Sequence, residues 1–210
     1  KIVDKVVIVD DCCPENSGKF VKKNFKSKKI SYIFLKKNSG VGGATIAGFK
    51  LAKKIKYDIV IKLDGDGQHN PNILKKIIKV LSSEKYDFCK GYRSLNIFIK
   101  DKMPLLRKIG NISLTLISKV ITGYFNLQDV TNGIVALKIS KLNSINIDLI
   151  KKNFFFEQDL IFHLSLKNFR LFQLKTETIY EDEKSNLKPI ESILPFTFYH
   201  IKNLIYKFFN

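Results

Sequence analysis

The chain has 210 residues with 37 basic and 19 acidic side chains, a formal net charge of +18, and 45% of its residues are hydrophobic. This length suffices for one well-packed domain, and the apolar content excludes an intrinsically disordered chain. The positive charge is compatible with nucleic acid, an anionic membrane surface or a phosphorylated substrate as a partner, and with a general bias toward lysine.

The cysteines and the apolar runs indicate which cellular compartment and which kinds of protein the sequence suits. Cys12, Cys13 and Cys89 show no zinc-site spacing, and a small odd number of cysteines suits a reducing cytosol. No stretch has the pattern of a secretory signal, and no uncharged apolar run reaches the length of about 18 residues that a membrane span requires.

The first apolar runs predict strands at residues 6–9 and 30–35. The first strand ends in the adjacent acids Asp10 and Asp11, and a helix is expected at residues 18–25. An acidic pair at a strand end also resembles the receiver domains of response regulators, although the rest of the chain fits that class less well.

Glycines follow the second strand. Asn38, Gly40, Gly42 and Gly43 precede a helix predicted at residues 45–54. Glycines before a helix let backbone N–H groups approach a phosphate, or they permit close packing of the helix on a strand. The chain lacks Gly-Lys-Ser and Gly-Lys-Thr, which excludes a P-loop.

Two carboxylates follow the next apolar run. Residues 59–63 predict a buried strand, and Asp64, Asp66 and Gln68 come directly after it. Residues i and i+2 of an extended segment point the same way, so the two acids repel each other unless a cation lies between them. The pattern predicts a divalent metal site for a phosphate-bearing substrate, with an ordinary surface turn as the alternative.

Two arginines lie further along the chain. Residues 71–81 predict a helix and residues 86–90 a strand, after which come Arg93 and, fourteen positions later, Arg107. A guanidinium can bind phosphate through two hydrogen bonds, although either arginine could be a solvated surface side chain. Residues 94–102 are expected to form a substrate loop.

A long helix is predicted at residues 105–123, with Ile109, Ile112, Leu116 and Val120 on one face. The serines and threonines within it argue against a membrane span. It precedes a polar turn that contains Asp129, Asn132 and Gly133 and leads into a strand at residues 134–137.

The last third of the chain contains a second acidic segment. Glu157 and Asp159 open a helix, where acids also serve as simple caps. Strands are predicted at residues 169–176 and 177–180. Residues 190–210 mix apolar and basic side chains in a way that favours an amphipathic helix at a membrane interface.

The run from Asp64 to His69 after an apolar strand resembles the Asp-x-Asp signature of family 2 glycosyltransferases, in particular the polyprenyl-phosphate sugar synthases. The likeness extends from about Val3 to about Pro195. It implies an α/β GT-A fold in residues 1–189, with a mostly parallel central sheet flanked by helices. Residues 190–210 would form an amphipathic, membrane-proximal helix. The chain begins where the family's second strand lies, so we expect the family's first strand to be missing.

The resemblance implies transfer of a sugar, with inversion, from a GDP- or UDP-sugar to a polyprenyl phosphate, with Mg²⁺ or Mn²⁺ as the cofactor. Metal ligands would be Asp64, Asp66 and Gln68. Catalytic roles fall to Asp66, Asp129, Asp159, Arg93 and Arg107. Substrate contacts fall to Asp10, Asp11, Asn38, Gly40, Gly42, Asp64, Gln68, Asn132, Gly133, Glu157, Ser185 and Asn186.

Alternatives remain open at this stage. A polyprenyl phosphate is already ionised and needs no general base, whereas a glycan hydroxyl needs one, for which Asp129 and Asp159 are the candidates. A catalytically idle nucleotide-sugar-binding module and a pyrophosphorylase-like enzyme are the rival classes. We expect peripheral association with the cytoplasmic face of an anionic membrane and no nucleic acid partner, and the oligomeric state is left open.

Overall fold

The computed structural model describes residues 2–55, 57–94, 103–176 and 189–209. Its strands are β1 (Val6–Asp10), β2 (Ile30–Phe34), β3 (Ile59–Lys62), β4 (Phe88–Tyr92), β5 (Val135–Lys138) and β6 (Leu171–Lys175). Its helices are α1 (Ser17–Asn24), α2 (Gly40–Ile55), α3 (Ile73–Leu81), α4 (Leu105–Thr122), α5 (Ile139–Asn143), α6 (Phe156–Ser165) and α7 (Pro189–Phe209), with a short 3-10 helix, η1 (Ile147–Leu149). The strand expected at residues 177–180 lies outside the described residues.

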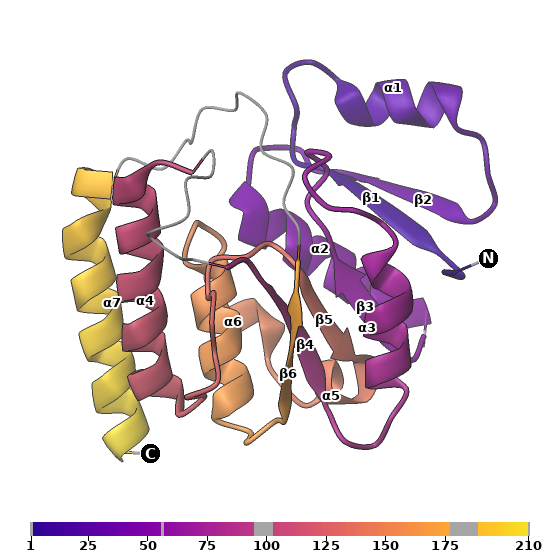
Figure 1. Ribbon diagram of the computed structural model, residues 1–210. Coiled ribbons are helices and arrows are strands. Elements are labelled where there is room, and N and C mark those ends of the chain that lie inside the picture. Colours follow the sequence, from indigo (N-terminus) through magenta and orange to yellow (C-terminus); the bar gives the residue numbers. More distant parts are fainter. Residues whose placement is uncertain (1, 56, 95–102, 177–188, 210) are drawn as a thin grey trace.

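The described strands form two sheets (Figure 1). β1 and β2 pair in parallel, and a four-stranded sheet has the order β3-β5-β4-β6. β5 is antiparallel to both β3 and β4, whereas β4 and β6 are parallel. β3, β4 and β6 therefore run in one direction, as the sequence predicts for a mostly parallel sheet, and their carboxyl ends meet at one edge.

Helices cover both faces of the four-stranded sheet, which confirms the predicted α/β class. Successive strand residues face opposite sides, so Phe88 and Leu137 join one buried cluster while Cys89 and Ala136 join the other. The first cluster is completed by side chains of α2, α5 and α6, and the second by α3. This layering fixes the strand register and with it the position of the residues after each strand.

α2 begins at Gly40, earlier than the sequence predicts. Gly40 has a φ of +76°, a conformation that favours glycine. A Cβ at Gly42 would lie 2.6 Å from the Lys151 carbonyl oxygen, and Gly43 N–H donates to the Lys152 carbonyl at 3.2 Å. These glycines therefore let the first turn of α2 pack directly on the backbone of residues 151–152.

α4 has the reverse of the usual amphipathic arrangement. Its buried face is largely polar and includes Lys108, Asn111, Thr115, Ser118 and Thr122. The predicted helix is confirmed, but Ile109, Leu116 and Val120 of its predicted apolar face are exposed. α7 lies beside α4 at one edge of the molecule (Figure 1), and Lys207 Nζ donates to the Ile121 carbonyl at 2.7 Å.

Candidate active site

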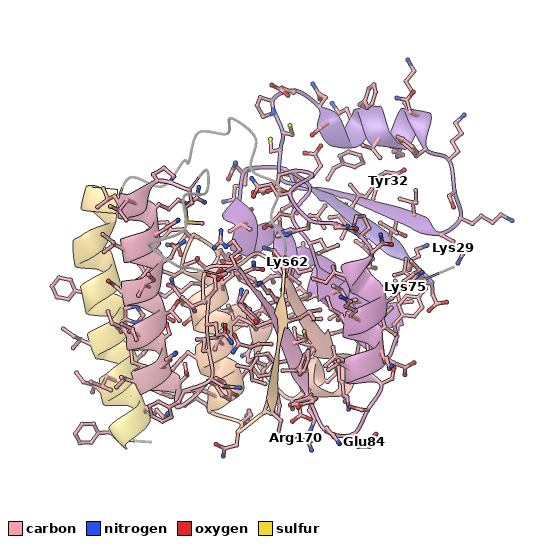
Figure 2. The ribbon with its side chains drawn as sticks, in the orientation of Figure 1. Lys29, Tyr32, Lys62, Lys75, Glu84 and Arg170 are labelled. Atoms are coloured by element: carbon pink, nitrogen blue, oxygen red, sulfur yellow. The ribbon has the colours of Figure 1, made fainter. Side chains whose placement is uncertain are left out.

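The candidate site lies at the carboxyl end of β3. Lys62, the last residue of β3, is near the middle of the molecule in Figure 2, far from Arg170 at the opposite end of the sheet. Its ammonium is 2.7 Å from Asp64 Oδ1 and 3.0 Å from Glu157 Oε1. Burial alone lowers the pKa of Lys62, but Glu157 and Asp64 outweigh it and raise the pKa above its ordinary value. Lys62 is therefore positively charged at neutral pH.

The predicted metal ligands lie on the turn that follows. Asp66 is exposed, and its Oδ1 accepts from the Gln68 N–H at 3.0 Å, whereas Asp64 is half-buried. Within the described ranges, no group of three or more His, Cys, Asp or Glu side chains is placed to hold a metal by itself. Two carboxylates and an amide oxygen nevertheless suit Mg²⁺ or Mn²⁺ when substrate phosphates complete the coordination. The donor chemistry thus fits a divalent metal bound together with a diphosphate.

Arg93 and Asp129 form a closely bonded pair. Arg93 Nε and Nη2 donate to the two Asp129 oxygens at 2.7 and 3.2 Å, and Nη2 also donates to Thr131 Oγ1 at 2.8 Å. The Asp129 carboxylate also accepts from the backbone N–H groups of Arg93 and Thr131 and from the Thr131 hydroxyl. Burial alone raises the pKa of Asp129, but Arg93 outweighs it, so the pKa is lowered. This arrangement favours a positioning carboxylate over a proton acceptor.

The turn before β5 packs against the ends of β3 and β4. Asn132 Nδ2 donates to Thr176 Oγ1 at 3.1 Å, and a Cβ at Gly91 would lie 2.5 Å from Asn132 Oδ1. A Cβ at Gly133 would overlap the Asp64 carboxylate. The structure therefore brings the predicted residues Asn132 and Gly133 next to Asp64, and Gly133 provides the room that this carboxylate occupies.

Two buried lysines at this site were not among the predicted site residues. Besides Lys62, Lys90 of β4 is fully buried, and its Nζ donates to the Asn132 carbonyl. Burial lowers the pKa of Lys90 to about 8, and the charges of Glu157 and Asp129 act in the opposite direction. A lysine inside an apolar strand is the signal that could have found both, because a buried ammonium needs a partner.

The acids after β1 organise turns. Asp10 accepts from the N–H groups of Cys13 and Gly18 at 2.8 and 2.9 Å. Asp11 accepts from the Ser39 N–H at 2.7 Å. These carboxylates therefore hold the turns that lead into α1 and α2, and their contact with a nucleotide stays a prediction.

The loop before α2 has a similar local explanation. Asn38 Oδ1 accepts from the Gly40 N–H at 3.1 Å, and Gly40 and Gly42 allow the close packing on residues 151–152. Their predicted role in nucleotide binding is untested by these contacts.

Asp159 has hydrogen-bond partners other than those of the Lys62 cluster. Its Oδ2 accepts from the Lys151 N–H at 2.7 Å, and its Oδ1 accepts from the Tyr199 hydroxyl at 2.8 Å. Asp159 thus connects α6 to α7 and to the loop that precedes α6. Tyr199 is a partner that sequence reasoning missed, since it lies forty residues away along the chain.

The remaining predicted residues are placed only in part. Arg107 is exposed on the first turn of α4. Ser185, Asn186 and most of the loop predicted at residues 94–102 lie outside the described residues.

Helices cover both faces of the sheet, and the acids Asp64 and Asp66 directly follow strand β3. This arrangement is typical of the GT-A fold. The model of the family "Glycosyl transferase family 2" matches residues 2–153. A solved structure with a TM-score of 0.65 and 12% identity, covering 94% of this chain and 68% of the other, is glucosyl-3-phosphoglycerate synthase from Mycobacterium tuberculosis in complex with Mn²⁺ and UDP-glucose.

Two curated relatives are more similar in sequence. One is a UDP-N-acetylglucosamine–dolichyl-phosphate N-acetylglucosaminyltransferase of Methanococcus voltae, 29% identical over 85% of this chain and 76% of the relative. The other is an undecaprenyl-phosphate mannosyltransferase of Micrococcus luteus, 26% identical over 80% of this chain and 69% of the relative. The chain belongs to family 2 of the glycosyltransferases and is a glycosyltransferase with a GT-A fold.

Proposed function

We propose that this chain transfers a sugar, with inversion, from a UDP- or GDP-sugar to a polyprenyl phosphate and requires Mg²⁺ or Mn²⁺. The observation that carries the proposal is the position of Asp64 and Asp66 at the carboxyl ends of the parallel strands, where ligands of such sheets bind. The two curated relatives, whose names specify dolichyl and undecaprenyl phosphate, support the acceptor class.

The donor would bind across the turn after β3. Asp66 would ligate the metal directly because its side chain is exposed, with Asp64 and Gln68 beside it. A bound divalent ion supplies Lewis-acid stabilisation of the diphosphate leaving group. Arg93, held in place by Asp129, would orient a phosphate of the donor through its guanidinium.

The contacts of the two candidate bases support the proposed acceptor class. The Asp129 carboxylate pairs with Arg93 and has a lowered pKa, and both oxygens of Asp159 already accept hydrogen bonds. Neither is well suited to remove a proton from a sugar hydroxyl. An ionised phosphate acceptor needs no such base, so these contacts favour it over a glycan hydroxyl. Arg107, exposed at the start of α4, would bind the lipid phosphate.

A membrane surface is the place where such an acceptor is found. No described helix is long and apolar enough to cross a membrane. The exposed apolar residues of α4 and α7, including Val120 at 66% and Phe198 at 72% exposed, instead form a face suited to lie on a lipid surface. We therefore assign residues 1–189 to the catalytic domain and residues 190–210 to a membrane-proximal helix that docks together with α4.

Thermal unfolding with nucleotide sugars tests the donor part. A ligand that binds only the folded state raises its melting temperature. We expect one UDP- or GDP-sugar to raise the melting temperature with Mn²⁺ present and to lose this effect when EDTA is added. If no nucleotide sugar stabilises the protein with Mn²⁺ or Mg²⁺, the proposed donor site is wrong.

A further inference from the structure

The Asp64 carboxylate is confined on both sides. Its Oδ1 is 2.7 Å from the Lys62 ammonium, and its Oδ2 fills the space that a Cβ at Gly133 would occupy. The carboxylate therefore has one oxygen paired with a cation and the other packed against backbone. Its orientation is fixed before any ligand arrives.

Lys62 is itself held from the other side. The side chain is 7% exposed, and its Nζ donates to Glu157 Oε1 at 3.0 Å. Glu157 lies in the first turn of α6, far along the chain from β3. Because an ammonium with two carboxylate partners is drawn toward both, Glu157 limits how closely Lys62 can bind Asp64.

We infer that Lys62 is a positioning residue that holds Asp64 before a divalent metal binds and competes with that metal for Asp64 Oδ1, with Glu157 setting the strength of the competition. This inference rests on the proposed metal-dependent function. Lys62 gives up part of its contact with Asp64 as the metal binds and keeps its contact with Glu157, which remains as its counter-ion.

The inference predicts that substitutions of Lys62 and of Glu157 change the affinity for Mn²⁺ in opposite directions. Lys62→Met removes the competing ammonium, so Mn²⁺ should bind about three- to tenfold more tightly. Glu157→Gln leaves Lys62 with Asp64 as its one carboxylate neighbour in this cluster, so Mn²⁺ should bind more weakly. Transfer should fall in both variants, because Asp64 is no longer held in the same orientation. A purely structural role would weaken Mn²⁺ binding in both.

The measurement is direct titration of the full chain with Mn²⁺, with free Mn²⁺ read from its electron paramagnetic resonance signal. Lys62→Arg keeps the charge and should bind Mn²⁺ within about twofold of the wild type. Lys138→Met is the matched control, because Lys138 is also a strand lysine with a 15% exposed side chain, bonded to the Ser83 carbonyl away from the site. It should leave Mn²⁺ binding unchanged.

A double-mutant cycle with Asp64→Asn decides whether Lys62 acts through Asp64. The effects of Lys62→Met and of Glu157→Gln should disappear in that background. Unchanged or weaker Mn²⁺ binding by Lys62→Met, or an effect that persists with Asp64→Asn, overturns the inference and leaves the proposed function standing. A wild-type chain that binds no Mn²⁺, with or without UDP and GDP, contradicts both. If Lys62→Met does not fold, Glu157→Gln and its cycle answer the same question.

Discussion

At the residue scale, the contacts of the site come from side chains that are distant in sequence. The position of Asp64 and Asp66 after an apolar strand could be predicted, because an apolar run followed by acids is a local pattern. The predicted burial of that strand was wrong, since the apolar residues of β3 are only partly buried at the end of the sheet order. The pairing of Lys62 with Glu157, and of Arg93 with Asp129, could not be predicted from any local pattern. The first pair depends on how β3 packs against α6, and the second on how the end of β4 meets the turn before β5.

Asp66 is the first residue to test. Asp66→Asn keeps the shape and the turn but removes a charge that a divalent metal needs. We expect transfer to fall by at least about a hundredfold and the Mn²⁺-dependent rise in melting temperature to disappear, since hard cations bind anionic oxygen most strongly. The melting temperature without ligand should stay near that of the wild type, because the side chain is exposed. An unchanged Mn²⁺ requirement for transfer would exclude Asp66 as a ligand.

Asp129 distinguishes a positioning role from a proton acceptor. Asp129→Asn neutralises a fully buried carboxylate that is bonded to the largely buried Arg93, so the free energy of unfolding should fall by about 3–5 kcal/mol. Urea unfolding at pH 7 measures this change. A variant that keeps wild-type stability but loses all transfer would instead indicate a catalytic base. Thr131→Val removes one hydroxyl bonded to the same pair and should cost much less, about 1 kcal/mol.

At the element scale, secondary structure was largely predictable and the environment of each element was not. The periodicity of α4 predicted a helix, and the reversed direction of its apolar face appeared only in the packing, where Asn111, Thr115 and Ser118 face inward. The glycines at the start of α2 were expected to approach a phosphate or to permit close packing. The structure places them in the first turn of the helix, where they allow close packing on residues 151–152, while phosphate binding stays a prediction. Periodicity identifies a face of a helix but not what covers it.

The edge between β4 and β6 gives a pH-dependent prediction. Asp87 accepts hydrogen bonds from the Arg170 N–H, Nε and Nη2 at the start of this parallel pair. Burial alone raises the pKa of Asp87, but Arg170 and Lys141 outweigh it and lower the pKa to about 2. The pKa of an aspartate in the unfolded chain is about 4. The charge of Asp87 therefore stabilises the folded state fully above pH 4, and this stabilisation is lost as the pH falls toward 2.

Asp87→Asn should therefore lower the free energy of unfolding by about 1–2 kcal/mol at pH 7, and the difference from the wild type should shrink between pH 4 and pH 2. Urea midpoints at several pH values measure it. Asp148→Asn is the control, because Asp148 pairs with Lys50 on the exposed surface and should change stability little. A difference for Asp87→Asn that stays constant down to pH 2 would contradict the role of its charge.

The exposed face of α4 and α7 predicts membrane binding. Leu116→Ser with Val120→Ser should reduce co-sedimentation with anionic vesicles of phosphatidylglycerol and phosphatidylcholine several-fold, because both side chains are exposed and apolar. Phe20→Ser on α1 is the matched control, since Phe20 is 65% exposed on a helix away from this face. High salt should weaken binding through the basic residues. If both variants lose vesicle binding equally, the face of α4 and α7 is not the membrane-binding surface.

At the scale of the whole molecule, the α/β class and the family followed from a strand that ends in Asp-x-Asp and from the helices around it. The division into two sheets did not, because an apolar run predicts a strand but not its neighbours. The net charge of +18 fits an anionic donor, an anionic acceptor and an anionic surface alike, so charge alone could not choose between them.

The central claim is that the acceptor is a lipid phosphate. The direct test measures transfer of radiolabelled sugar from UDP- and GDP-sugars, with Mn²⁺, to polyprenyl phosphate and to the matching polyprenol. We expect product with the phosphate and not with the alcohol, together with loss of transfer in Asp66→Asn. Arg107→Ala should reduce transfer at least about tenfold while the donor still raises the melting temperature, and Arg107→Lys should restore part of it because it keeps the charge without the bidentate geometry. Transfer to the alcohol or to a glycan that depends on Asp159, with polyprenyl phosphate inert, would contradict the account.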